Sequence, residues 1–234
     1  MNLIYLDFVK NALSSLINLK VSLLSIMQQL NKLFFLLIPL FISGFIHLWN
    51  PVGYPDIFFD EGIYMRRAMN FLDTGNPQED YLYDHPYFGQ IAIASILAIT
   101  NYSDFHPSSE PASLQSLYMT PRIFMGLLAT LDTFLIYKIV QIKYGRNPAF
   151  LSATLFAVLP FTWILKRILL DSILLPLVLG SIFLALYSSK AKQNTPWIIF
   201  SGILLGLAVF TKIPAFTMIF VVAWIVYTNR KKLS

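Results

Sequence analysis

Two adjacent carboxylates, Asp60 and Glu61, open a segment with helical spacing in a chain that is otherwise poor in charge. Charged residues make up 12% of the 234 residues, whereas 56% are hydrophobic. An acid at this position can stabilise a helix N-terminus, where free N–H groups and the helix dipole favour negative charge. It can also take a proton from a hydroxyl or amine, as a general base does. Tyr64 and Arg67 follow Asp60 at four and seven positions, so the spacing predicts that they share its face.

Other polar residues stand at the edges of apolar runs. They are His85 in "YDHPYFGQ", Arg122 in "TPRIFMG", Arg167 and Asp171 in "LKRILLD", and Lys212 in "FTKIP". Each has a simple structural explanation: Arg122, Lys166 and Lys212 can extend to lipid headgroups, and Arg167 and Asp171 can pair across one helical turn. Together, a group of mixed sign beside a bilayer predicts a polar cavity.

The apolar runs that must position these residues approach the length of a bilayer crossing, about 17–25 residues. They are Leu33–Trp49, Tyr87–Thr100, Pro121–Gln141, Ala149–Leu165, Ser172–Leu186, Trp197–Phe210 and Ile213–Tyr227. With a mean hydropathy of +0.64, the chain is predicted to be an all-α, polytopic transmembrane bundle with about six spans plus juxtamembrane helices. The short run Tyr87–Thr100 lies at the surface or re-enters. "TKIP" predicts two short helices meeting at a turn, and the Gly202/Gly206 pair indicates close helix packing.

Three parts of the chain follow from this pattern. Residues 1–32 have apolar residues at helical spacing and predict an amphipathic helix on the cytoplasmic side of the membrane, with a disordered leader as the alternative. Residues 33–228 form the transmembrane domain, with an outer loop over 50–120, and 229–234 form a basic cytoplasmic tail.

The absence of Cys excludes disulfides and thiolate chemistry. The net charge of +5 is assigned to cytoplasmic loops, because no nucleic-acid surface is recognisable.

The distribution of Lys and Arg sets the orientation. If Tyr87–Thr100 does not cross, the inner segments hold eleven basic residues and one acid, and the outer face holds six basic residues and ten acids. If it does cross, this bias disappears. Both termini are therefore predicted to be cytoplasmic, in a plasma membrane or, in a eukaryote, the endoplasmic reticulum. The same topology places seven polar residues from five segments at the outer face: Asp60, Glu61, His85, Arg122, Arg167, Asp171 and Lys212.

Five motifs in this order resemble the GT-C superfamily of glycosyltransferases that use polyprenyl-phosphate sugars, specifically the protein O-mannosyltransferase and lipid A aminoarabinose transferase branch. They are Asp60–Glu61, His85-Pro86-Tyr87, Arg122 with Gly126, Arg167 with Asp171, and Gly206-Leu207 to Thr211-Lys212. The resemblance extends from about Phe58 to Phe216. Tyr87 replaces a frequent second Pro, and family members usually continue with more spans, so the chain is similar to the N-terminal half only.

The resemblance implies transfer of a sugar from a polyprenyl (dolichyl-type) phosphate to a protein, lipid or glycan at the outer or lumenal face. It implies an inverting hexosyl- or pentosyltransferase with Asp60 as the base that activates the acceptor and Glu61 as the second candidate. The resemblance also implies that the donor phosphate is bound by His85, Arg122, Arg167 and Lys212, and that Asp171, Tyr64 and Arg67 have supporting roles.

Several points stay open at this stage. No cofactor is assigned, and a divalent cation would have Asp60 and Asp171 as candidate ligands. Membrane lipids and a subunit supplying missing spans are expected partners. The alternatives are a non-catalytic or truncated GT-C-like subunit and a transporter-like module. Asp132, an acid within a span, is a functional candidate or a partner in a helix–helix hydrogen bond, and "NYS" (Asn101–Ser103) fits a glycosylation acceptor.

Overall fold

The computed structural model describes residues 2–78, 83–99, 111–191 and 194–230, and all regular elements within these ranges are helical. The chain divides into two compact units, Met1–Ile38 and Pro39–Ser234. Helix α1 (Asn2–Leu48) supplies the first unit and continues into the second. The helix predicted for residues 1–32 is therefore present, and its described side chains from Asn18 to Asn31 are exposed. Its placement on a membrane surface stays a prediction.

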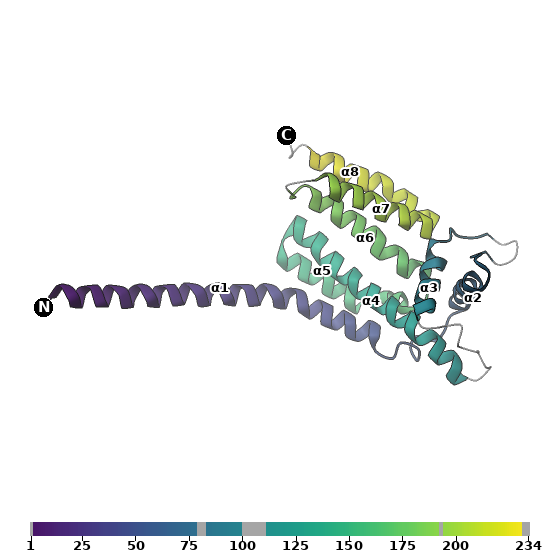
Figure 1. The fold of residues 1–234 in the computed structure, drawn as a ribbon, viewed down its shortest axis with the longest axis horizontal. Coiled ribbons are helices and arrows are strands. Elements are labelled where there is room, and N and C mark those ends of the chain that lie inside the picture. Colours follow the sequence, from purple (N-terminus) through teal and green to yellow (C-terminus); the bar gives the residue numbers. More distant parts are fainter. Residues whose placement is uncertain (1, 79–82, 100–110, 192–193, 231–234) are drawn as a thin grey trace. The chain divides into compact units, whose positions relative to one another are not determined.

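The second unit contains a bundle of helices that lie side by side (Figure 1). Its members are α4 (Pro111–Tyr144), α5 (Arg146–Val158), α6 (Leu170–Ser188), α7 (Thr195–Thr211) and α8 (Met218–Arg230). Helix α6 is central, because it contacts α4, α7 and α8. The turn predicted at "TKIP" is confirmed: α7 ends at Thr211 and the 3₁₀ helix η3 (Ile213–Thr217) leads into α8.

Among the described residues, three helical stretches have the length and hydropathy of a membrane span: Asn18–Leu48, Leu114–Tyr144 and Leu170–Ser188. A fourth span is formed if α5 and the 3₁₀ helix η2 (Pro160–Lys166), which meet at 69°, count as one broken crossing. Helices α7 and α8 have 17 and 13 residues, which at about 1.5 Å per residue is less than a hydrocarbon core of about 30 Å. The prediction of about six spans is therefore not confirmed.

Two helices lie at the end of the bundle where α6 begins. They are α2 (Phe59–Thr74) and α3 (Phe88–Ile99). Helix α3 contacts α2, α4, α6 and α7 and runs across the bundle end in Figure 1. With 12 residues it is too short to cross by itself, in agreement with the surface or re-entrant placement predicted for this run.

A buried apolar cluster fixes α2 and α3 against the bundle. Met65 of α2, Ile93 of α3, Met125 of α4 and Leu170 of α6 are each almost or fully inaccessible. Leu117 and Tyr118 join the same cluster, which explains why α4 begins at Pro111, ten residues before the apolar run that predicted it. Residues that precede the membrane span are thus held in helical form by packing.

Glycine permits close approach between elements at Gly89, Gly126 and Gly180, but not at the predicted Gly202 and Gly206. A Cβ on Gly126 would lie 2.6 Å from the carbonyl oxygen of His47, and one on Gly180 would lie 3.0 Å from Leu204. By contrast, a Cβ on Gly202 or Gly206 would meet nothing within 4 Å. Among the described residues, the close packing predicted for these two glycines is therefore wrong, and α6 and α7 approach each other at Gly180 instead.

Candidate active site

The bundle end that carries α2 and α3 brings together the polar residues of the five motifs. Arg122 of α4 reaches Glu61 of α2, and Glu61 reaches the backbone of Ile168 just before α6. Lys212, at the end of α7, reaches Asp171 in the first turn of α6. Five segments that are distant in sequence therefore meet in one place, as their predicted location on one face required.

Glu61 and Arg122 form an ion pair with both side chains fully buried. The Nη2 and Nε atoms of Arg122 donate to Glu61 Oε1 and Oε2 at 2.6 and 2.9 Å. Glu61 also accepts hydrogen bonds from the backbone N–H groups of Phe58 and Ile168, each at 2.9 Å. One carboxylate thus ties the start of α2 to α4 and to the residue that leads into α6.

The remaining N–H groups of Arg122 donate to backbone carbonyl groups in the loop before α2. Its Nη1 donates to the carbonyl oxygens of Pro51 and Pro55 at 2.8 and 2.7 Å, and its Nη2 donates to that of Asp56 at 3.2 Å. A guanidinium has five N–H donors, and all five are engaged. The phosphate contact predicted for Arg122 and the second-base role predicted for Glu61 stay predictions, and both groups are engaged within the protein.

Asp60 and Arg167 differ from the Glu61–Arg122 pair because, among the described residues, neither charged group forms an ion pair or a hydrogen bond. These two charges are called unmatched below. In the described part of the chain, no hydrogen bond engages the half-buried Asp60 carboxylate or the Arg167 guanidinium, and Arg167 Nε is buried without a partner. The Arg167 guanidinium lies 5.1 Å from the centre of the Phe58 ring, two residues before Asp60. A carboxylate and a guanidinium without hydrogen-bond partners among the described residues thus both lie near the start of α2.

Lys212 and Asp171 form a more exposed ion pair. Lys212 Nζ donates to both carboxylate oxygens of Asp171 at 2.9 Å, and half of the Asp171 side chain is accessible. The pairing of Asp171 with Arg167 along one helix, considered from the sequence, is wrong: Arg167 has an extended backbone and lies before α6 begins. The Lys212 side chain is 24% accessible, so the pair is reachable from the surface.

Tyr64 lies in the middle of the acidic side of this site. Burial raises the pKa of Tyr64 to about 12, and the negative charges of Asp60, Asp84 and Asp171 add to the effect. The phenol therefore stays protonated at neutral pH and is available as a hydrogen-bond donor. The ring of His85 lies 6.4 Å from that of Tyr64, so the His-Pro motif borders the same surface.

Arg67 is almost fully buried on the same helix and forms an ion pair with Asp84. Burial by itself raises the pKa of Asp84, but the hydrogen bond and charge of Arg67 outweigh it and hold this pKa below its usual value. Sequence reasoning missed Asp84, although it directly precedes His85 in "YDHP". The pair attaches the segment before α3 to α2.

Two cationic side chains, those of Arg122 and Lys166, make contacts that the sequence did not predict. Arg122 is fully buried and Lys166 is 2% exposed, so neither extends to lipid headgroups. Lys166 Nζ instead donates to the carbonyl oxygens of Trp49 and Ile46, at 3.1 and 3.4 Å, at the end of α1. The periodicity of the chain carried no signal for this contact, because it joins residues more than a hundred positions apart.

Asp132 lies outside this site. Its side chain is fully buried in α4, and neither carboxylate oxygen has a hydrogen-bond partner among the described residues. The helix–helix hydrogen bond considered for it is therefore absent from that part of the chain. Asn101–Ser103 lies outside the described residues.

No cluster of three or more His, Asp or Glu side chains suited to a metal ion occurs within the described ranges. Asp171, one of the two candidate ligands, is bonded through both oxygens to Lys212. The defining features of the candidate site are therefore its ion pairs and the unmatched charges of Asp60 and Arg167.

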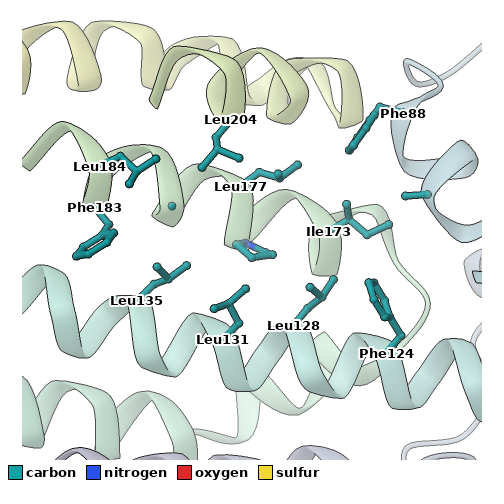
Figure 2. A pocket seen from close by; sticks show the side chains of 13 residues that line it. Phe88, Phe124, Leu128, Leu131, Leu135, Ile173, Leu177, Phe183, Leu184 and Leu204 are labelled. Atoms are coloured by element: carbon teal, nitrogen blue, oxygen red, sulfur yellow. The ribbon is translucent and has the colours of Figure 1, made fainter. Parts of the chain in front are cut away.

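An apolar groove lies between α4 and α6 and extends to the site (Figure 2). Its volume is about 420 Å³ and all of its lining residues are apolar. Phe88 of α3 and Ile173 of α6 line one end, and Phe183 and Leu135 line the other. Phe88 belongs to α3, so one end of the groove lies at the bundle end that carries the candidate site.

The fold and site define an integral membrane protein made of helices, with a polar, ion-paired site at one bundle end beside an apolar groove. The sequence profile of the family described as dolichyl-phosphate-mannose-protein mannosyltransferase matches residues 116–234. Since this is half of the chain, the protein belongs to that family, which consists of membrane glycosyltransferases of the GT-C type. No curated protein and no solved structure gives a significant match to the chain.

Proposed function

We propose that the protein transfers a sugar from a polyprenyl-phosphate donor to an acceptor hydroxyl or amine at the bundle end formed by α2 and α3. The Asp60 carboxylate and the Arg167 guanidinium, which have no hydrogen-bond partner among the described residues, are the observation that carries this proposal. Burying charge without a partner is costly, so such groups are best explained by a ligand that completes them. The family membership supports a glycosyl transfer as the reaction.

Asp60 takes the proton from the acceptor as its oxygen or nitrogen attacks the anomeric carbon of the sugar. The bond between that carbon and the phosphate oxygen breaks, and the polyprenyl phosphate leaves with the charge that develops on it. Attack from the face opposite the leaving group inverts the anomeric centre. A positioned base contributes typically about 10²–10⁴-fold to the rate of such a step.

Arg167 and Lys212 stabilise the departing phosphate, because cations in a water-poor site act strongly on phosphoryl oxygens. Lys212 exchanges Asp171 for the phosphate, and the protonated Tyr64 and His85 supply hydrogen bonds at the edge. Glu61, Arg122 and the Arg67–Asp84 pair hold the segments that carry these groups. The apolar groove of Figure 2 takes the first part of the polyprenyl chain, since one end is lined by Phe88 of α3 and the groove has the size of a typical ligand site.

The proposal is tested with purified protein in proteoliposomes that contain a radiolabelled polyprenyl-phosphate sugar. Asp60→Asn is expected to lower kcat by about 10²–10⁴-fold and to leave donor binding unchanged, because the carboxamide cannot take a proton. Arg167→Ala is expected to raise KM for the donor. Lys143→Ala, at the opposite end of α4, is the control and should behave as the unaltered protein.

Full activity of Asp60→Asn would remove Asp60 as the base. If the unaltered protein binds polyprenyl phosphate but transfers no sugar to protein, lipid or glycan acceptors, the non-catalytic subunit becomes the better interpretation.

A further inference from the structure

The residue before Arg167 ends a short 3₁₀ helix, and that element needs external support. Helix η2 (Pro160–Lys166) follows α5 at an angle of 69°. A 3₁₀ helix has poorer hydrogen-bond geometry than an α-helix, and a break within a membrane span leaves carbonyl groups that water cannot reach. The position of Arg167 therefore depends on whatever satisfies the carbonyl groups at this break.

Thr162 and His47 satisfy them. The Thr162 hydroxyl lies within hydrogen-bond distance of the carbonyl oxygens of Leu159 and Phe156, at 2.7 and 2.9 Å. The carbonyl oxygen of Thr162 lies 3.2 Å from Nε2 of His47 in the last turn of α1. His47 is fully buried and Thr162 is 3% exposed, so these contacts have no competing water.

His47 is itself held by neighbouring polar groups. Its Nδ1 lies 3.2 Å from the Ser43 hydroxyl and 2.8 Å from the Ser43 carbonyl oxygen. The Ser43 hydroxyl also lies 2.7 Å from that of Thr133 on α4. Gly126 has no side chain to separate α4 from His47, whose carbonyl oxygen would be 2.6 Å from a Cβ there. A connected polar network thus crosses from α4 through α1 to η2.

The other end of η2 returns to the same part of α1. Lys166 donates to the carbonyl oxygens of Trp49 and Ile46. On the far side, the N–H of Ile168 donates to Glu61. Arg167 is therefore the single residue between two anchored neighbours, and its own guanidinium makes no hydrogen bond within the described residues.

We propose that His47 is a positioning residue, which holds η2 through the Thr162 carbonyl so that Arg167 faces the donor phosphate. Nε2 carries the proton in this proposal, because an unprotonated Nε2 cannot donate to the Thr162 carbonyl. Nδ1 then accepts a hydrogen bond from the Ser43 hydroxyl at 3.2 Å, and its 2.8 Å contact with the Ser43 carbonyl oxygen is not a hydrogen bond. The role assigned to Arg167 rests on the proposed function, whereas the effect of His47 on the order of residue 167 does not.

The sequence contains no Cys, so a single nitroxide can be attached at Arg167→Cys and its mobility followed by electron paramagnetic resonance. His47→Leu is expected to increase the mobility of this label, since leucine fills space but donates no hydrogen bond. His47→Gln is expected to restore the immobile spectrum, because its amide N–H can donate to the Thr162 carbonyl. Ser181→Ala is the matched control: it removes a buried interhelical hydrogen bond between α6 and α7, to Ser201 at 3.1 Å, and should change nothing at residue 167.

An unchanged spectrum in His47→Leu would overturn the proposal. If His47→Leu does not fold, Lys166→Met and Thr162→Val carry the test, because each removes one anchor of η2 and should mobilise the label. Affinity for polyprenyl phosphate, measured without the label, separates the two proposals. A loss of about tenfold in both Arg167→Ala and His47→Leu supports both, whereas a loss in neither, together with a mobilised label, contradicts only the role of Arg167 in the proposed function.

Discussion

At the level of single residues, neighbouring charges in this site have different environments. Glu61 and Arg122 pair with each other, and their remaining hydrogen-bonding capacity is used by neighbouring backbone groups. Asp60, directly before Glu61, has no hydrogen-bond partner among the described residues, and neither has the Arg167 guanidinium. A fully paired buried group stabilises a structure, whereas an unmatched one is suited to a ligand. The difference decides which motif residues are proposed to react.

The Glu61–Arg122 pair gives the first prediction at this scale. Glu61→Gln and Arg122→Met are each expected to lower the free energy of unfolding by about 3–5 kcal/mol, because each leaves the other charge buried and unpaired. Thermal unfolding in detergent measures the loss. The double variant is expected to recover part of it, since no unpaired charge remains. Additive losses in the double variant would show that the two side chains do not act as a pair.

At the level of secondary-structure elements, two features position the site residues. They are the break between α5 and α6 and the short helix α3. Helix η2 ends at Lys166 and α6 begins at Leu170, and Arg167 and Leu169 between them have extended backbone. Helix α3 packs across the end of the bundle and brings Phe88 to the mouth of the apolar groove. Because α3 is too short to span a membrane, its placement at the membrane edge stays the prediction.

The glycines give a prediction for helix packing. Gly126→Ala is expected to destabilise the protein by about 1–3 kcal/mol, the usual cost of overpacking, because its Cβ meets the His47 carbonyl oxygen. Gly202→Ala is the matched control, with open space at its Cβ position, and should be neutral or stabilising by up to about 1 kcal/mol. Equal unfolding temperatures for the two variants would contradict the close approach of α4 to α1.

At the level of the whole molecule, the bias of Lys and Arg predicts the orientation in the membrane. Asp73 lies on α2 at the site end, and Tyr144 is exposed at the opposite end of α4. In intact cells, a membrane-impermeant maleimide is expected to label Asp73→Cys and to leave Tyr144→Cys unlabelled until the cells are permeabilised. The background is clean, since the sequence has no Cys. Labelling of Tyr144→Cys from outside would reverse the orientation and place the proposed site in the cytoplasm.

The sequence by itself determined the helical membrane class, the helix that begins at Asp60 and Glu61, and the turn at "TKIP". Each follows from local composition and spacing, because apolar length, capping acids and helix-breaking residues act within a few turns. Residues of the five motifs were also placed together correctly, since charge bias assigned them to one face. The number of spans was not confirmed, because length along the sequence does not reveal a 69° break or helices too short to cross.

Only the tertiary structure decided which of these charges pair. Arg122 and Glu61 are 61 positions apart, and Lys212 and Asp171 are 41 positions apart. The contacts of Lys166 with the end of α1 and of His47 with Thr162 also join distant parts of the sequence, so no sequence periodicity predicts them. The packing of α2, α3 and η2 sets these distances. Hydrogen bonds act only over about 3 Å, so the fold alone separates the residues that hold the site from those left for a ligand.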